Sequence, residues 1–254
     1  MGSPIYLDHN ATTPPAAAVV EAVARASATV FGNPSSIHAA GQLARRELDT
    51  ARSEVAALIG ADPGEVVFTS GGTEADNLAL RGVAEASEGR KRRRIVVGAV
   101  EHEAVINTAR ALGKRGWPVA IVPVDGRGIV APEALAPLLD DEVALVSVML
   151  ANNETGVVQP VRELAALARE RGALFHTDAV QAVAKMPVDV KALGVDLLTL
   201  TGHKFSGPKG AGALWVRRGT AMASPVTGGR QERGRRAGTE NVPALVGLGV
   251  AARL

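Results

Sequence analysis

The stretch 197-LLTLTGHKFSGPKGAGALWV-216 contains two apolar runs, Leu197–Thr201 and Ala211–Val216, separated by a turn rich in glycine and proline. The turn is too short for a crossover helix, so the two runs are expected to pair as antiparallel strands. His203 and Lys204 directly follow the first run. The pattern therefore places an imidazole and an amine at the end of a buried strand.

Upstream of this stretch, the chain alternates between short apolar runs and helical patterns. The apolar runs are continuous rather than alternating, which is typical of strands that are covered on both sides. Between them, residues 161–172 and 73–86 show helical spacing, and Thr73 is expected to cap the second of these helices. The five further strands are expected at Val66–Thr69, Ile95–Val100, Val119–Val124, Ala144–Leu150 and Ala173–Thr177. The sequence thus predicts an α/β fold with a mixed, mostly parallel seven-stranded sheet and helices on both faces.

The composition sets limits on the class of protein. The 254 residues are 46% hydrophobic, carry a net charge of +2 and include no cysteine, which removes disulfides and thiol nucleophiles from this chain. No apolar run approaches the roughly 20 residues that span a bilayer, and the first residues lack a signal-peptide pattern, so a cytoplasmic protein without a membrane partner is expected. The basic run 89-GRKRRR-94 is interpreted as a solvated turn rather than a nucleic-acid patch.

Polar residues follow five of the predicted strands, and ligands of open α/β sheets bind beyond the carboxyl ends of strands. Each residue has a plain structural alternative: a tight turn, a structural histidine, a helix-capping aspartate or a solvated lysine. Because the five strand ends converge on one edge of the sheet, a shared ligand explains them together. The residues in question are Gly72 and Thr73, His102, Asn153, Asp178 with Gln181, and His203 with Lys204.

A ligand with a phosphate, a basic ring nitrogen and an aldehyde fits this set, and pyridoxal 5'-phosphate has these features. Lys204 would anchor it, because desolvation at a strand end and the neighbouring His203 would favour a neutral, nucleophilic amine. Asp178 would pair with the ring nitrogen and His102 would stack on the ring. The remaining contacts are expected from Gln181 and Asn153 to the ring hydroxyl, and from Gly72, Thr73, Thr201 and His203 to the phosphate.

Eight segments together resemble the cysteine desulfurases of the NifS/IscS type, which belong to the class V branch of fold-type I pyridoxal-phosphate enzymes. The resemblance runs almost from end to end, and the segments are specific only in combination. They are 6-YLDHNATTP-14, 32-GNPSSIHAAGQLARREL-48, 68-FTSGGTEADNLAL-80, 101-EHEAVINTA-109, 147-SVMLANNETGVVQPV-161, 175-FHTDAVQAV-183, 201-TGHKFSGPKGAGALWVR-217 and 228-GGRQERGRRAGTENVPALVG-247.

The resemblance implies a role for each matched residue. Lys204 would be the Schiff-base lysine, and His102 a candidate acid–base group as well as the stacking residue. Thr239 resembles the residue that family members lend to the phosphate of the neighbouring subunit, which implies a homodimer; a helix N-cap is the alternative interpretation. His9 and Asn10, in an amino-terminal arm of residues 1–15, are expected near the site. The other implied cofactor contacts are those already given: Asp178, Gln181, Asn153, Gly72, Thr73, Thr201 and His203.

The implied reaction takes sulfur from L-cysteine, leaves alanine and passes the sulfur to an enzyme cysteine, for delivery to an iron–sulfur scaffold or another acceptor protein. Family members carry that cysteine, and an arginine for the substrate carboxylate, in a smaller carboxy-terminal domain. Residues 16–254 are therefore interpreted as the cofactor-binding large domain of a truncated desulfurase, unable by itself to complete sulfur transfer. A selenocysteine lyase, a class V aminotransferase and an inactive dimerisation partner are the alternatives, and no metal site is expected.

Overall fold

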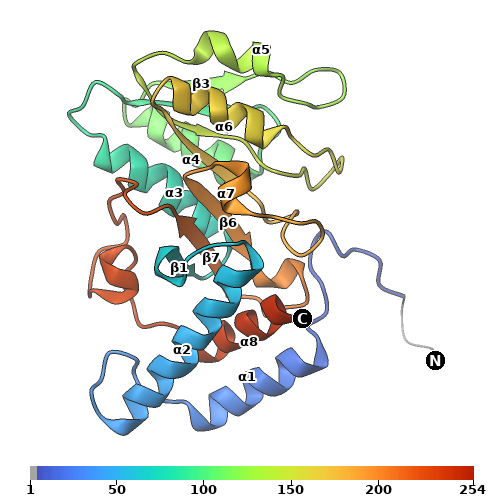
Figure 1. Ribbon diagram of the computed structural model, residues 1–254, viewed down its shortest axis with the longest axis vertical. Coiled ribbons are helices and arrows are strands. Elements are labelled where there is room, and N and C mark those ends of the chain that lie inside the picture. The colour runs from blue at the N-terminus through green and yellow to red at the C-terminus, as the bar shows by residue number, and fades with distance from the viewer. Residues whose placement is uncertain (1–4) are drawn as a thin grey trace.

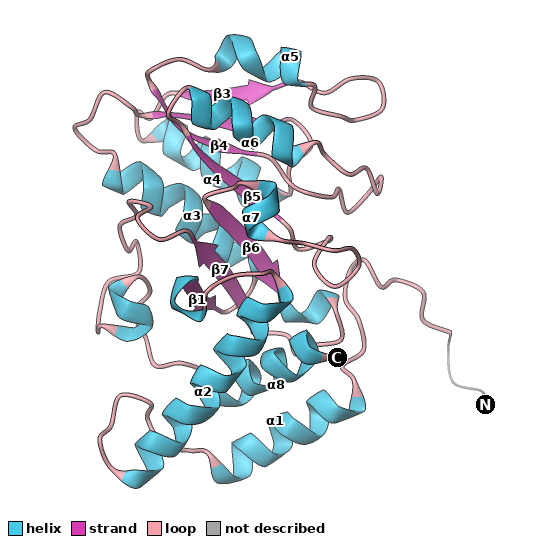
Figure 2. Cartoon of the chain, in the orientation of Figure 1, coloured by secondary structure: helices cyan, strands magenta, loops and turns pink. Residues whose placement is uncertain are grey.

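A computed structural model describes residues 5–254; the first four residues of the predicted arm lie outside the described part. A seven-stranded sheet runs through the molecule, with strand order β1-β7-β6-β5-β4-β2-β3 (Figures 1 and 2). The strands are β1 (Val66–Thr69), β2 (Arg94–Gly98), β3 (Val119–Val122), β4 (Val143–Ser147), β5 (Leu174–Asp178), β6 (Leu197–Thr201) and β7 (Gly212–Val216).

All seven predicted strands are present, and the sheet is mixed as predicted. Strand β7 is antiparallel to both of its neighbours, β1 and β6, whereas β2 to β6 form parallel pairs. The expected runs 95–100, 119–124 and 144–150 extend beyond the strands, which end at Gly98, Val122 and Ser147. At two of these three strand ends, those of β2 and β4, the chain continues to residues predicted to contact the ligand, His102 and Asn153.

Helices cover both faces of the sheet, and the side-chain alternation of the strands shows which helix covers which face. Val67 of β1 packs in one apolar cluster with α3 and α4, whereas Val66 and Phe68 pack on the opposite side with α2, α6 and α8. The helices are α1 (Ala17–Thr29), α2 (Ala39–Leu58), α3 (Gly72–Ala86), α4 (Glu103–Lys114), α5 (Pro132–Leu135), α6 (Val161–Glu170), α7 (Val190–Leu193) and α8 (Val242–Arg253).

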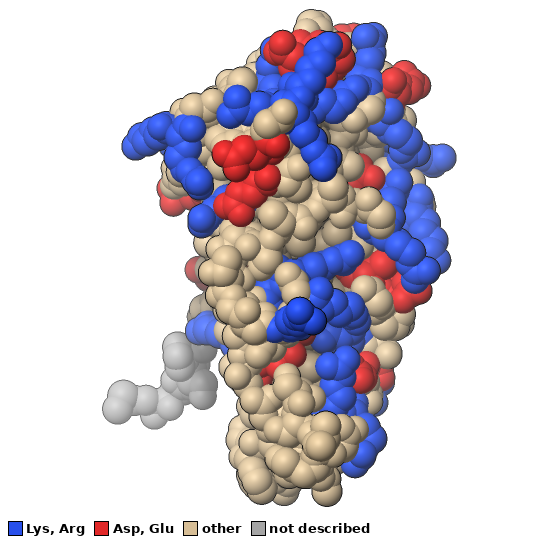
Figure 3. Space-filling model, turned by 90° about the vertical axis from the view of Figure 1, so that its left-hand side faces the viewer, with Lys and Arg blue, Asp and Glu red and all other residues tan. Residues whose placement is uncertain are grey.

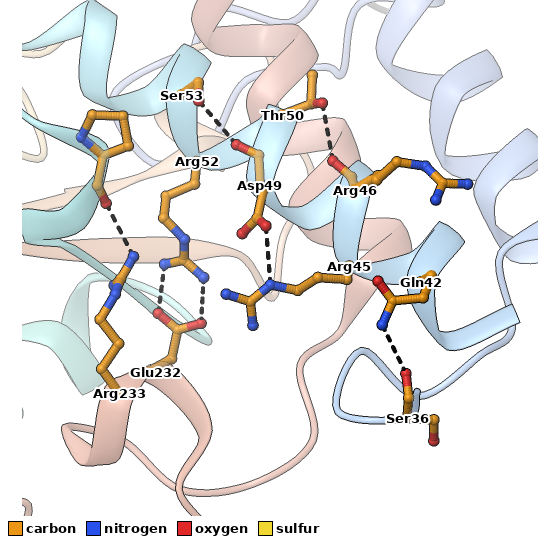
Figure 4. A network of polar contacts seen from close by, with 11 residues as sticks. Ser36, Gln42, Arg45, Arg46, Asp49, Thr50, Arg52, Ser53, Glu232 and Arg233 are labelled. Atoms are coloured by element: carbon orange, nitrogen blue, oxygen red, sulfur yellow. Dashed lines mark hydrogen bonds and ion pairs between the residues drawn. The ribbon is translucent and has the colours of Figure 1, made fainter. Parts of the chain in front are cut away.

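Helices α1, α2 and α8 form a separate group beside the β1 edge of the sheet (Figure 1). A small apolar cluster that includes Ala26, Ala44 and Val246 holds the three helices together. The segment after β7 returns to this edge, where Glu232 forms a buried ion pair with Arg52 of α2, with a shortest distance of 2.6 Å (Figure 4). The β1 edge is thus closed by chain that is distant from it in sequence.

The basic run 89–94 is an exposed turn over residues 89–91, as predicted, whereas residues 92–94 are partly buried and Arg94 begins β2. Lys91 pairs with Asp141, and Arg94 lies 2.6 Å from Asp140 and 2.7 Å from Glu142. The acidic segment before β4 therefore neutralises part of this run within the chain. On the face shown in Figure 3, basic side chains are likewise interspersed with acidic ones.

None of the helices in residues 5–254 combines the length and the apolar character that a bilayer crossing requires.

Candidate functional site

A cavity of about 500 Å³ lies where five strands deliver their carboxyl ends. Of the ten residues predicted to contact the cofactor, nine line it and Thr239 does not. Lys204 and Asp178, on which the interpretation depends, are thus brought to one small space. The nine residues are Gly72, Thr73, His102, Asn153, Asp178, Gln181, Thr201, His203 and Lys204.

One end of the cavity is formed by the loop that joins β1 to α3. Helix α3 begins at Gly72 with Gly71 as its N-cap, and no side chain caps it, so the expectation that Thr73 is the cap is wrong. A methyl group on Gly72 would come within 2.9 Å of Val180, and one on Gly212 within 2.7 Å of the Gly71 backbone. Small residues therefore let the loop pack tightly and leave the first N–H groups of α3 available for an anion.

Lys204 lies in a single helical turn, Gly202–Lys204, directly after β6. Its ammonium group donates to the backbone oxygens of Asn10 at 2.5 Å and Ala11 at 2.9 Å. Burial lowers the pKa of Lys204, and the charges of Asp178 and Asp8 oppose that shift. The amino-terminal arm thus reaches the site through Asn10, whereas the equally expected His9 does not line the cavity and packs edge-on against Tyr6.

His203 does not supply the cationic neighbour that was expected for Lys204. Burial lowers the pKa of His203, and the charges of Lys204 and Lys209 lower it further, so the imidazole is mainly neutral at pH 7. Its Nδ1 lies 3.2 Å from the Thr12 hydroxyl. Desolvation alone therefore lowers the pKa of the lysine.

Asp178 ends β5 and is 5% exposed. One carboxylate oxygen accepts a hydrogen bond from the Val180 N–H at 2.9 Å. Burial raises the pKa of Asp178, while this N–H and the charges of His102 and Lys204 oppose the rise. The carboxylate is therefore short of positive partners, as expected of a group that meets a cationic ligand.

His102 precedes α4 and caps it: its Nδ1 accepts a hydrogen bond from the Ala104 N–H at 3.1 Å. This contact assigns the proton of the neutral ring to Nε2 and fixes the plane of the imidazole. The capping role was not expected from the sequence. It makes His102 a rigid wall of the cavity.

Gln181 and Asn153 both contact the amino-terminal arm. Gln181 donates to the backbone oxygen of Asn10 at 2.9 Å and accepts from Lys185 at 2.5 Å. The Asn10 side-chain amide donates to the backbone oxygen of Asn153 at 3.5 Å. Asn10 therefore links two of the predicted contacts to the lysine.

Thr239 lies outside the cavity on an exposed stretch before α8. The cap of α8 is Asn241, whose side chain accepts from the Ala244 N–H, so the alternative interpretation of Thr239 as an N-cap is wrong. Arg236 of the same segment pairs with Glu74 of α3 at 2.7 Å. Thr239 is thus exposed in a segment that Arg236 ties to α3, at the glycine-lined end of the cavity.

Three buried polar residues near the cavity were missed: Asp76, Glu101 and His176. Asp76 lines the cavity, and burial, with a contribution from the charge of Asp178, raises its pKa well above the usual range. Asp76 lies four residues after Gly72 on α3, and His176 lies two residues before Asp178 on β5. Helix and strand periodicity would therefore have placed Asp76 and His176 on the same faces of their elements as these two predicted residues. Within residues 5–254, no group of three potential ligands is arranged to hold a metal ion.

Comparisons with known proteins agree with this geometry. The sequence profile of the family described as Aminotransferase class-V matches residues 5–254. A cysteine desulfurase IscS of Methanosarcina thermophila is 47% identical over 250 residues, and a cysteine desulfurase of Trichormus azollae is 50% identical over 252 residues. These alignments cover 98% and 99% of this chain but 62% of each relative, so the chain spans about 62% of the length of these curated relatives.

Solved structures give the same result. A NifS-like protein superposes with a TM-score of 0.95 at 41% identity, covering 99% of this chain and 69% of that protein. A structure described as SspA in complex with cysteine superposes with a TM-score of 0.94 at 35% identity, covering 98% and 72%. The match of profile, sequence and fold over nearly every described residue shows that this chain belongs to the class-V aminotransferase family.

Proposed function

We propose that the cavity binds pyridoxal 5'-phosphate and that the protein is a cysteine desulfurase of the NifS/IscS type. The observation that carries the proposal is the meeting of nine predicted residues on one cavity. The relatives named cysteine desulfurase and the structural neighbour that holds cysteine support this substrate.

The phosphate would occupy the glycine-lined end of the cavity. The start of α3 offers backbone N–H groups and the positive end of a helix dipole, and Thr73, Thr201 and His203 line the same place. Gly72 suits this cradle because the Cβ of a larger residue would collide with the Val180 side chain, 2.9 Å away. The donors suit a dianion, and among residues 5–254 the acidic side chain that borders this end, Glu74, is already paired with Arg236.

The ring would lie between Asp178 and His102. The buried carboxylate of Asp178 would meet the protonated ring nitrogen and gain the positive partner that it lacks. The capping hydrogen bond holds His102 in one orientation for stacking, with Gln181 and Asn153 toward the ring oxygen. When bound, the cofactor supplies an electron sink that stabilises negative charge beside the amino group of an amino acid.

Lys204 would anchor the cofactor and then carry the proton of the substrate. Its lowered pKa favours the neutral amine, and release from the carbonyls of Asn10 and Ala11 would free it to act. His102 is placed to exchange a second proton through Nε2, because its Nδ1 is engaged by the backbone. These residues therefore supply both an anchor and two proton carriers.

The overall reaction converts cysteine and a thiol into alanine and a persulfide: a C–S bond breaks and an S–S bond forms, without an external oxidant or reductant. These 254 residues contain no cysteine, so the accepting thiol has to come from another polypeptide segment or another molecule. We infer that residues 16–254 act as the cofactor-binding domain, with the preceding residues as an arm, beside a further domain that supplies this thiol. A scaffold or other sulfur-acceptor protein would then receive the sulfur.

A homodimer with shared sites is part of this proposal. Thr239 is exposed, does not cap α8 and lies near the segment that Arg236 ties to α3. It is therefore free to reach the phosphate bound by a second subunit.

The test is to incubate the purified protein with pyridoxal 5'-phosphate, reduce the mixture with borohydride and locate the modification by peptide mass spectrometry. The expected result is stoichiometric modification at Lys204, a visible absorption band before reduction, and loss of both in Lys204→Ala. Lys185→Ala is the matched control, since Lys185 is a neighbouring lysine with a lowered pKa that should not be modified. Modification spread over surface lysines would reject the cofactor site; alanine formation from cysteine with added thiol then tests the reaction itself.

A further inference from the structure

Three carboxyl groups are buried at or beside the cavity: Asp76 of α3, Glu101 after β2 and Asp178 at the end of β5. Asp76 and Asp178 line the cavity, and Glu101 is close enough to both for their charges to interact. We call the three groups the carboxyl cluster. Within residues 5–254, none of the three pairs with a lysine or arginine. Two or three neighbouring buried carboxylates without such partners would repel one another strongly, so the cluster must hold protons.

Asp76 has the surroundings of a protonated acid. Its Oδ1 is buried without a hydrogen-bond partner, and the nearest nitrogen is Nε2 of His176, 3.6 Å away. That histidine is not a cation, because complete burial lowers its pKa to about 3. An ionised Asp76 would therefore be a buried charge with an unsatisfied oxygen, whereas the neutral acid needs only one acceptor.

Acceptors for that proton are present. Thr199 of β6 faces Asp76, and its hydroxyl lies 3.0 Å from Nε2 of His176. The other ring nitrogen of His176 lies 2.8 Å from the Ser147 hydroxyl. Asp76 thus faces a chain of neutral groups that can accept or pass on a hydrogen bond.

Asp178 has the opposite surroundings. It accepts the Val180 N–H at 2.9 Å, and His102 and Lys204 face it across the cavity. Glu101 lies deeper: its Oε1 accepts the Met149 N–H at 2.7 Å, while its Oε2 has no partner. Of the three, Asp178 therefore has the most stabilisation for a negative charge.

We propose that Asp76 is a positioning residue for the cofactor ring: it stays protonated behind Asp178, so that the carboxyl cluster carries its single negative charge on Asp178, against the ring nitrogen. This inference rests on the proposed cofactor site. It implies that a neutral hydrogen-bond donor at position 76 supports ring binding, whereas an apolar residue of similar size does not.

The protonation state is tested on cofactor-free protein at neutral pH by infrared difference spectroscopy. Protein labelled with carbon-13 at the aspartate carboxyl group should show a shifted carbonyl stretch of a protonated acid, which Asp76→Asn removes and Glu101→Gln does not. If Asp76→Asn does not fold, the label alone still separates a protonated aspartate from Glu101. Absence of a protonated aspartate band would overturn the inference.

Ring binding is tested by titrating the same proteins with 4'-deoxypyridoxine 5'-phosphate, which lacks the aldehyde and so binds without Lys204. Asp76→Leu and Asp178→Asn are each expected to weaken binding about tenfold or more, the worth of a hydrogen bond to a charged group, and Asp76→Asn about threefold or less. If Asp76→Asn weakens binding as much as Asp178→Asn, the aspartate acts as an anion and the inference is wrong. Failure of the unaltered protein to bind would instead reject the proposed function.

Discussion

Two groups of buried ionisable side chains lie in different parts of the molecule, and they differ in whether a partner of opposite charge is present. Beside β1, Arg52 and Glu232 form a bidentate pair with side chains 4% and 1% exposed (Figure 4). Arg52 also donates to the Val66 carbonyl, and Glu232 accepts the Phe68 N–H. Within residues 5–254, the carboxyl cluster has no such partner. The balanced pair closes an edge of the fold, whereas two of the three unpaired acids, Asp76 and Asp178, line the cavity.

The largest effect is expected from breaking the balanced pair. Glu232→Ala leaves the Arg52 guanidinium buried without its partner, which should lower the free energy of unfolding by about 3–5 kcal/mol. Urea denaturation of the parent and the variant measures this difference in the free energy of unfolding. The double variant Arg52→Met/Glu232→Leu should recover most of the loss, because both charges then leave the interior together. A loss of under about 1 kcal/mol in the single variant would contradict the comparison.

The second expected effect is a dependence of stability on pH. Burial raises the pKa of Asp76 and Glu101 well above their usual values. Unfolded carboxyls ionise near pH 4, so above that pH the native state binds more protons and stability falls as pH rises, until the native pKa is passed. Glu101→Gln should remove up to about 1.4 kcal/mol per pH unit of this slope while keeping an acceptor for the Met149 N–H. Equal slopes in the two proteins would show that Glu101 is ionised in the folded state.

A third prediction separates stability from binding. Asp178→Asn retains an oxygen for the Val180 N–H but removes a buried charge, so cofactor-free protein should be as stable as the parent, or more stable by about 1 kcal/mol. Binding of the cofactor should weaken by about 1.5–3 kcal/mol. Thermal unfolding with and without pyridoxal 5'-phosphate gives both quantities. Loss of stability without loss of cofactor binding would assign Asp178 to the fold instead of the site.

The smallest expected effect concerns an ion pair of intermediate exposure. Arg236 and Glu74 are each 21% exposed, so solvent screens their attraction, and Glu74→Gln should cost about 0.5–1 kcal/mol. The cost should shrink at high salt, which it should not do for Glu232→Ala. Glu47→Gln, which breaks the more exposed pair with Arg25, is the control, and it should change the free energy of unfolding least.

The strands, and nine of the residues that line the cavity, could be predicted from the sequence because their signals are local. Each strand is a continuous apolar run, and each site residue follows one, as Asp178 follows β5 and Lys204 follows β6. The antiparallel pairing of β6 with β7 followed from the short turn between them. Such features depend on spacing along the chain alone.

Other features could not be predicted because they depend on packing between distant segments. Gly71 replaces Thr73 as the cap of α3 because the loop packs against β7, and Asn241 replaces Thr239 as the cap of α8. The neutrality of His203 follows from its burial. The protons of the carboxyl cluster depend on partners that come from three separate elements, which no single stretch of sequence indicates.

The pairing of β1 with β7 has a consequence for synthesis of the chain. Among the strands of residues 5–254, β1 pairs with β7 alone, with Val66 opposite Trp215, so it has no partner there until the ribosome has delivered β7. At usual elongation rates this wait lasts on the order of ten seconds. The loop after β1, which we propose holds the phosphate, can therefore reach its final position only after the turn that carries Lys204 has been translated. Early fragments of the chain should accordingly lack the affinity for the cofactor that the finished sheet provides.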